Sequence, residues 1–212
     1  MKRSFTPEIR NRKKEELTPI ALSLFLERGV DDVKMTDIAN SASIGVATLY
    51  RYFSVKKSIV IASGILLWKK LYQDFLSLEK ECENKDGYTS LKIMMNQFLL
   101  TYEKKPSFFI FLRQFDSFCI QEKILPEELN EYDDCVLLVK NIYDRTIQKG
   151  IEDHSIQPLR DKDTLYFTMT KAFIGLAQKL ISEENQFESD SKRDKKTQLK
   201  LLLEIFLTYY RK

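Results

Sequence analysis

The sequence has few of the residues that build catalytic and metal sites. It holds one histidine, His154, and three cysteines, Cys82, Cys119 and Cys135, none of which forms a CxxC pair. An odd number of widely spaced cysteines argues against a disulfide framework and against structural zinc. A catalytic triad or a histidine-based metal site would have to be assembled around the single imidazole. We therefore expect no enzyme activity, no metal and no cofactor.

Long apolar segments are also missing. No run of about 18 uncharged apolar residues occurs, so no transmembrane helix is predicted. The first 16 residues are charged throughout and lack the apolar segment of a signal peptide, so we expect a cytoplasmic protein. GxGxxG and P-loop patterns, which cradle nucleotide phosphates, are absent as well. Aromatic residues, in contrast, make up 12% of the 212 residues, enough for a substantial core.

Positive charge is concentrated near the N-terminus. Residues 1–60 hold eleven Lys and Arg against seven Asp and Glu, so this part carries +4 while the whole chain carries +3. A basic cluster comes first, formed by Lys2, Arg3, Arg10, Arg12, Lys13 and Lys14. Such a cluster can contact a phosphate backbone, and it can equally be a solvated end of a helix.

Apolar spacing predicts an all-α fold, because apolar residues recur three and four positions apart and no segment alternates with a period of two. The predicted helices cover about 7–28, 35–42, 45–52, 55–78, 91–102, 108–118, 127–149, 161–184 and 195–211. Gly29 and Gly150 are predicted to end two of them, and Pro19 predicts a kink or a restart capped by Thr18 within the first. The segment 183–196 between the last two helices is polar.

The segment from Lys34 to Lys57 predicts two short helices joined by a tight turn. The first helix has a stripe formed by Met35, Ile38, Ala39 and Ala42. In the second, Ile44, Leu49 and Phe53 are placed to face inward. The residues left for the outside are Val46, Ala47, Thr48, Tyr50, Arg51 and Tyr52. A helix of this length fits a major groove, and these groups can contact base edges, methyl groups and phosphates, so the pattern predicts a DNA-reading helix-turn-helix.

This segment resembles the TetR family of bacterial transcriptional regulators. The resemblance lies in Asp37-Ile38-Ala39, in the run from Ala42 to Phe53, and in Lys56, and it covers roughly residues 9–57. Ser43 stands where the family usually has the turn glycine, Gly45 at its capping serine, and Val33-Lys34 at its two threonines.

The family resemblance implies two domains. These are a three-helix DNA-binding domain over 1–54 and a helical effector-binding and dimerisation domain over 55–212. Operator contacts are expected from Thr36, Val46, Ala47, Thr48, Tyr50, Arg51 and Tyr52, with Lys56 as a phosphate contact.

Five phenylalanines between Phe108 and Phe118 are too many for one narrow helix face. Core packing explains them, and so does the wall of an apolar effector cavity. The family resemblance favours the cavity, because family members generally hold a ligand in the second domain. The candidate cavity residues are Phe98, Tyr102, Phe108, Phe111, Phe115, Tyr132, Val136 and Tyr143, with Arg113, Gln114 and Asp116 as further polar groups. The expected effector is small and apolar.

The last two predicted helices each carry an apolar stripe. Together with the small residues Ala172, Gly175 and Ala177 they suit a four-helix bundle between two copies of the chain, although both helices can also pack inside one subunit. The predicted interface consists of Leu165, Met169, Ala172, Phe173, Leu176, Leu180, Leu202, Phe206 and Tyr209. We therefore predict a homodimeric, ligand-responsive repressor. The alternative is a helical DNA-binding protein without an effector, which organises the chromosome or recruits a partner protein.

Overall fold

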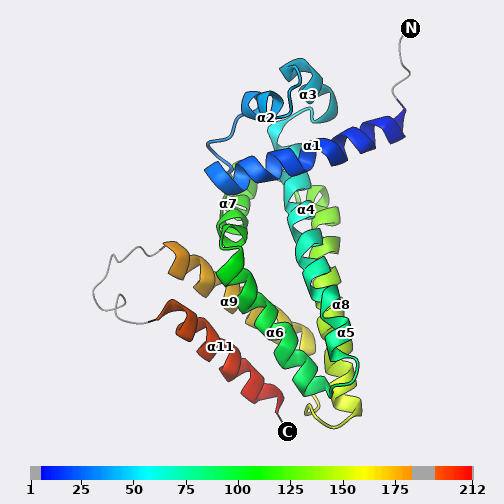
Figure 1. Cartoon of the computed structure of the whole chain (residues 1–212), viewed down its shortest axis with the longest axis vertical. Coiled ribbons are helices and arrows are strands. Elements are labelled where there is room, and N and C mark those ends of the chain that lie inside the picture. Colours follow the sequence, from blue (N-terminus) through cyan, green and yellow to red (C-terminus); the bar gives the residue numbers. More distant parts are fainter. Residues whose placement is uncertain (1–5, 183–193, 212) are drawn as a thin grey trace. The chain divides into compact units, whose positions relative to one another are not determined.

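A computed structural model of the chain describes residues 6–182 and 194–211 (Figure 1). Within these residues the fold is all-α, as predicted, and the only β-type pairing is one isolated bridge between Ile156 and Arg211. The elements are α1 (Pro7–Arg28), α2 (Met35–Ser41), α3 (Val46–Tyr52), α4 (Lys56–Ser77), α5 (Glu79–Cys82), α6 (Gly87–Lys104), α7 (Ser107–Gln121), the 3-10 helix η1 (Pro126–Leu129), α8 (Asn130–Glu152), α9 (Lys162–Ser182) and α11 (Lys195–Tyr210). Lys2 and Arg3 of the predicted basic cluster, and 183–193 of the predicted polar segment, lie outside the described residues.

The chain forms two compact units that do not follow a single cut in the sequence. The first unit consists of residues 1–70 and 111–135, and the second of residues 71–110 and 136–212. The predicted helix-turn-helix falls in the first unit, together with most of α7 and the start of α8. These units differ from the two domains predicted from the sequence, and that functional division stays a prediction.

The first unit begins with α1, a helix of 22 residues, and α2 and α3 lie on one side of it (Figure 1). It ends at Gly29 as predicted, where φ is 93° and the N–H donates to the Phe25 carbonyl. The predicted restart at Thr18 is wrong, because α1 runs through Pro19 without a break. The Thr18 hydroxyl donates to the Lys14 carbonyl at 2.7 Å instead of capping a new helix. Pro19 is exposed, so water can bond the Glu15 carbonyl that lacks its helical donor.

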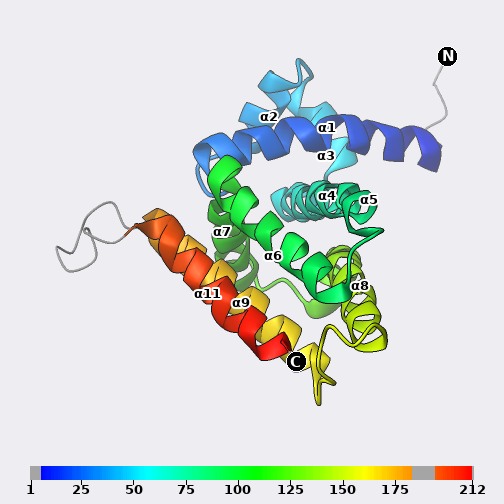
Figure 2. The same ribbon diagram turned by 60° about the horizontal axis from the view of Figure 1, so that its bottom comes forward.

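The second unit packs α6, α9 and α11 together, and Figure 2 shows α11 running alongside α9. Aromatic rings dominate its core: Phe173 lies 5.8 Å from Phe98 and 6.2 Å from Phe109, measured between ring centroids. A buried hydrogen bond of 2.9 Å joins the hydroxyls of Tyr143 and Tyr210, and thereby α8 to the end of α11. These long-range contacts hold together helices that are distant in the sequence.

Gly150 has a different role from the predicted one. Helix α8 does not end there but continues to Glu152. The glycine permits a close approach, because a Cβ at Gly150 would lie 2.4 Å from Cδ1 of Ile156, and a Cβ at Gly87 would lie 2.1 Å from Cα of Gly150. The start of α6 therefore packs directly on the backbone of α8, where Gly87 has no room for a side chain, and Gly150 has none against Ile156.

Candidate nucleic-acid interface

The turn between α2 and α3 contains Ser43 and Gly45, the two residues that differ here from the pattern usual in the TetR family. Ser43 adopts a φ of 53°, the left-handed region in which a non-glycine residue is strained. Gly45 is the N-cap of α3, with φ −68° and ψ 144°, and it has no side chain to bond the free N–H groups of the helix. The turn is nevertheless closed, since the Ile44 N–H donates to the Ala39 carbonyl at 3.0 Å. The sequence therefore forms the helix-turn-helix at some cost in local stability.

Helix α3 presents one face to solvent. Leu49 and Phe53 are buried as predicted, with 0% and 1% of their surface exposed. Tyr50 is 46% exposed, and Ala47 and Arg51 are exposed as well. Of the other predicted operator contacts, Thr36 is exposed, and Val46 and Thr48 are half-buried.

Tyr52 corrects the sequence prediction, which placed it on the outside of the recognition helix. It is only 6% exposed, because it follows Leu49 by three residues and so lies on the same inward face. The Arg51 guanidinium lies over its ring, 5.5 Å from the centroid. Tyr52 therefore supports the recognition helix from behind, and the exposed aromatic group is that of Tyr50.

Lys56 begins α4 and folds back onto the protein. Its Nζ donates to the Asp31 carbonyl at 3.3 Å and lies 5.8 Å from the centroid of the Phe118 ring. Partial burial of the ammonium lowers the pKa of Lys56 from its ordinary value, although nearby carboxylates oppose this. An ammonium has three donors, so bonding Asp31 leaves donors for a phosphate.

Part of the positive charge of this unit is balanced within it. Arg12 lies 3.6 Å from Glu16, which also pairs with Lys13, and Lys57 pairs with Glu128. The Arg12, Lys13 and Glu16 side chains are largely exposed, and those of Lys57 and Glu128 are about one third exposed, so the pairs contribute little to stability and can be exchanged for phosphate contacts.

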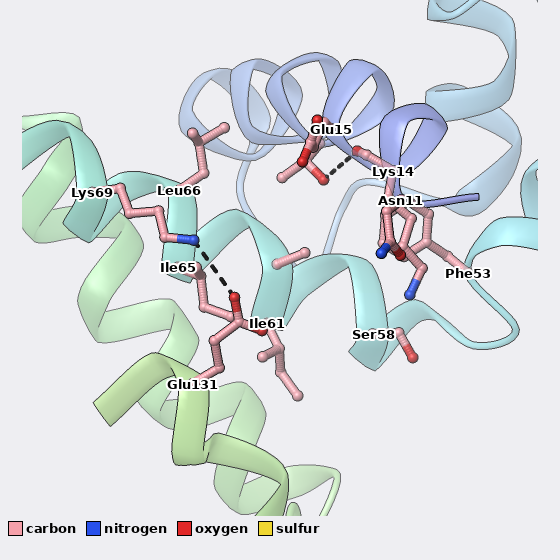
Figure 3. Close-up of a pocket in the computed structure, with 12 residues that line it drawn as sticks. Asn11, Lys14, Glu15, Phe53, Ser58, Ile61, Ile65, Leu66, Lys69 and Glu131 are labelled. Carbon is pink, nitrogen blue, oxygen red and sulfur yellow. Dashed lines mark hydrogen bonds and ion pairs between the residues drawn. The ribbon is translucent and has the colours of Figure 1, made fainter. Parts of the chain in front are cut away.

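A groove of about 610 Å³ lies between α1 and α4 in the first unit (Figure 3). Ile61, Ile65 and Leu66 of α4 form its apolar floor. Lys14 reaches down from α1 past Phe53, with Nζ 5.4 Å from the ring centroid.

Charged groups of both signs surround this groove. Glu131 lies 3.5 Å from Lys69 across the opening, and both of these side chains are largely solvated. Lys14 and Glu15 add one charge of each sign from α1. The groove is large enough for a small molecule, but its balanced charges favour neither an anion nor a cation.

The predicted effector residues divide between the two units instead of gathering in one. Phe111, Phe115 and Tyr132 belong to the first unit, whereas Phe98, Tyr102, Phe108, Val136 and Tyr143 belong to the second. The rings of Phe115 and Tyr132 stack at 4.6 Å, which is core packing. Gln114, predicted as a polar group of the cavity, instead accepts the Val30 N–H at 3.1 Å.

Phe98 and Tyr143 border a small internal cavity of about 20 Å³ in the second unit. This volume holds about one water molecule and no effector. The cavity is almost wholly apolar, and its other lining residues are Phe75, Leu91, Met94, Met95, Val139, Ile142, Tyr166 and Met169. Met94 and Met95 lie within the helix predicted over 91–102, but the sequence did not connect them to a cavity.

The predicted dimer residues differ in exposure. Met169, Phe173 and Leu180 are buried inside the subunit, Tyr209 is 54% exposed, and Leu165, Ala172, Leu176, Leu202 and Phe206 are half-buried. Sequence reasoning missed Leu201 and Ile205, which are 55% and 59% exposed. The available signal was that the apolar residues of α11 extend beyond the side formed by Leu199, Leu203, Leu207 and Tyr210, which packs in the core, and leave only a narrow polar stripe.

Other kinds of site find little support in the part of the chain that the structure describes. There, no three His, Cys, Asp or Glu side chains come together as metal ligands. No helix among the described residues is long and apolar enough to cross a bilayer. Burial raises the pKa of the Cys82 and Cys135 thiols, which disfavours the reactive thiolate.

The helical fold and the exposed face of α3 define a helix-turn-helix protein of the DNA-binding class. Residues 20–62 match the family model for bacterial regulatory proteins of the tetR family. The resemblance to the TetR family noted in the sequence is thus confirmed for this segment, which contains α2 and α3. No protein of curated function matches the sequence.

Solved structures share the fold over nearly the whole chain. A putative TetR-family regulator from Mesorhizobium loti has a TM-score of 0.68 and 14% identity, covering 96% of this chain and 98% of its own. A putative regulator from Saccharomonospora viridis, in complex with choline, has a TM-score of 0.67 and 19% identity, covering 92% and 96%. The regulator FadR from Bacillus subtilis, in complex with stearoyl-CoA, has a TM-score of 0.61 and 18% identity, covering 93% and 99%. At these identities the similarity establishes the fold.

Proposed function

We propose that this chain is a homodimeric repressor that binds a palindromic operator and is released from it by a small molecule. The observation that carries the proposal is the exposed face of α3, on which Ala47, Tyr50 and Arg51 stand above a buried Leu49. An aromatic hydroxyl, a methyl group and a guanidinium on one short helix are suited to base edges, thymine methyls and phosphates in a major groove. Such a protein acts on the chromosome, so we place it in the cytoplasm and assign it no enzymatic activity.

A second copy of the chain is needed because one helix-turn-helix reads too few base pairs to find a site in a genome. The exposed apolar residues of α11 supply a surface for it. Leu201, Ile205 and Tyr209 follow one another at intervals of four, so they form one stripe along the helix. On α9, Gly175 has no atom within 4 Å of an added Cβ, so another helix can approach closely there. We propose that α9 and α11 pair with their copies and set the recognition helices about 34 Å apart.

We place the effector in the second unit, at the cavity bordered by Met94, Met95 and Met169. The similar folds from Saccharomonospora viridis and Bacillus subtilis hold choline and stearoyl-CoA, which supports a ligand in this chain too. Three methionines around a cavity of about 20 Å³ can change rotamer and let it open. A ligand that binds only the opened form shifts the population away from the DNA-binding state, and its affinity for the two forms must differ by a few kcal/mol, about 5.5 for a complete switch.

The DNA-binding step is tested on an operator first identified by sequencing genomic fragments that the protein retains. Tyr50→Ala should weaken operator binding by about 1–3 kcal/mol, as expected for loss of a base contact. Tyr50→Phe, which keeps the ring, separates the contribution of the hydroxyl. Lys56→Ala should weaken binding to every sequence and reduce the salt slope by about one unit. Unchanged operator affinity in folded Tyr50→Ala would remove α3 as the reading element.

The dimer is tested with Ile205→Glu, measured by sedimentation at micromolar concentration. Ile205 is 59% exposed in the single chain, so the substitution leaves the subunit folded, but it would bury an unpaired charge in the proposed interface. Lys200→Glu, on a neighbouring exposed position of the same helix, is the control and should remain dimeric. A monomeric wild-type protein would contradict the proposal.

The effector is tested by a thermal-shift screen of apolar and amphiphilic small molecules. A stabilising compound should also release the protein from its operator, because both effects come from selective binding to one conformation. If no compound in a broad screen stabilises the protein, the alternative of an effector-free DNA-binding protein is favoured.

A further inference from the structure

The turn between α1 and α2 is held in place by a residue far along the chain. The backbone N–H of Val30 donates to Oε1 of Gln114, which belongs to α7, at 3.1 Å. Val30 is 0% exposed, so water cannot easily replace this acceptor. The bond joins residues 84 positions apart, and both belong to the first unit.

The backbone next to Val30 is shaped to receive the Gln114 amide. Gly29 adopts a φ of 93°, where a side chain is strained. A Cβ at Gly29 would also lie 3.0 Å from Nε2 of Gln114, too close for an unstrained contact. The glycine thus ends α1 and at the same time leaves room for the glutamine side chain against the turn.

A second contact holds the same turn one residue further on. The Asp31 carbonyl accepts from Nζ of Lys56 at 3.3 Å, and this ammonium lies 5.8 Å from the Phe118 ring centroid. Phe118 follows Gln114 by four residues, so both lie on one face of α7. We call Gln114, Phe118 and Lys56 the turn clamp.

The turn clamp acts on the segment that leads into the helix-turn-helix. Helix α2 begins at Met35, five residues after Val30, and it packs against α3. The clamped turn therefore sets how α2 and α3 are carried by the rest of the first unit. We propose that Gln114 is a positioning residue for operator recognition, which fixes the orientation of α3 through the Val30 amide without contacting DNA. This inference rests on the proposed function, since it assumes that α3 reads the operator.

Positioning and general stability have different consequences for DNA binding. Specific binding requires α3 to meet base edges in one orientation, whereas binding to unrelated sequences depends mainly on charge near the phosphates. A loosened turn should therefore weaken specific binding and leave non-specific binding unchanged. A merely structural role would lower the melting temperature, with no selective effect on the operator.

The test compares Gln114→Leu with two related variants. Leucine has nearly the same volume but no acceptor, so the buried Val30 N–H loses its partner. Gln114→Glu keeps an acceptor and serves as the conservative variant. Gln121→Leu makes the same change at an exposed position of α7 and is the matched control. Gln114→Met, which keeps the side-chain length, is measured in parallel in case the leucine variant folds poorly.

Two quantities are measured on each full-length variant. Hydrogen exchange of the turn, residues 29–34, reports on the clamp without any DNA. Affinity for the identified operator and for a scrambled duplex of equal length, at one salt concentration, reports on positioning. Gln114→Leu should exchange the Val30 amide faster and lose about tenfold in operator affinity, the equivalent of one buried group left unpaired, with unchanged scrambled-duplex affinity. Gln114→Glu and Gln121→Leu should behave like wild type.

Two outcomes would overturn the inference. In the first, Gln114→Leu or Gln114→Met keeps slow exchange at Val30 and wild-type operator affinity. In the second, the variants lose operator and scrambled-duplex binding equally, which indicates general damage. Failure of the proposed function itself looks different, because wild type would then show no preference for any operator while the exchange measurement still reports on the clamp.

Discussion

Replacing Gly64 by alanine tests how rigid the core of the first unit is. Gly64 lies in α4 against two aromatic rings: a Cβ there would be 3.0 Å from Cε2 of Tyr132 and 3.1 Å from Cε2 of Phe115. The two rings stack at 4.6 Å with an interplanar angle of 17°. The Tyr132 hydroxyl also accepts the Trp68 indole N–H at 2.7 Å. The ring of Tyr132 is therefore held on two sides and cannot move away freely.

Two effects of opposite sign decide the result. Alanine favours a helix over glycine by about 0.5–1 kcal/mol, because the unfolded glycine chain has more freedom to lose. Overpacking a well-filled core costs about 1–3 kcal/mol. Since Tyr132 is held by both its stack and its hydrogen bond, we expect the strain to win and Gly64→Ala to lower the free energy of unfolding by about 1–2 kcal/mol.

The assay is urea unfolding followed by circular dichroism, with Ala62→Gly as the control in the same helix. Ala62 is half-buried at the groove, so its replacement measures mainly helix propensity and should cost about 0.5–1 kcal/mol. If Gly64→Ala stabilises the protein by as much as Ala62→Gly destabilises it, the rings yield without cost and the reasoning is refuted.

Three further predictions concern local features. Ser43→Gly should raise the free energy of unfolding by about 1 kcal/mol, because Ser43 has a φ of 53°; a loss of stability in urea unfolding would contradict this. Burial acts to raise the pKa of Asp153, but hydrogen bonds from a neighbouring hydroxyl and from backbone groups including the Gly87 N–H outweigh it and lower the pKa. Wild type should therefore be more stable than Asp153→Asn above about pH 4, and the difference should vanish as the pH falls through the folded pKa; a pH-independent difference would exclude this linkage. Tyr143→Phe should cost about 1–3 kcal/mol in thermal unfolding because the buried Tyr210 hydroxyl loses its partner, whereas replacing both tyrosines should cost less than the sum of the single changes.

The local signals in the sequence were sufficient for the longer helices and for the DNA-reading segment. Gly29 was predicted to end α1, and the predicted range 7–28 is that of the structure. The helix-turn-helix could be recognised because its residues lie within one short stretch, where apolar spacing and turn residues act over a few positions. Gly150 shows the limit of such signals, since a glycine that ends a helix and one that admits a neighbouring backbone look alike in sequence.

Side-chain partners across the fold were decided only by the tertiary structure. Gln114 was predicted from the sequence as a polar group of a cavity, but its side-chain oxygen accepts a hydrogen bond from the Val30 N–H, 84 positions away. Lys56 was predicted from the sequence as a phosphate contact, but in the folded chain its ammonium also donates to the Asp31 carbonyl. The sequence left Tyr52 for the outside of α3, but in the fold it lies on the inward face with Leu49 and is only 6% exposed.

Local order and long-range contact have different physical origins, which explains this division. Helix formation depends on propensity, capping and a periodic apolar face, all of which are written in neighbouring residues. Which buried N–H finds which acceptor depends on how helices pack, and packing is set by the shapes of many side chains at once. The sequence by itself therefore determined an all-α chain with a DNA-reading segment at its N-terminal end. Only the tertiary structure decided that α7 holds the turn in front of that segment, and that Leu201, Ile205 and Tyr209 of α11 stay exposed.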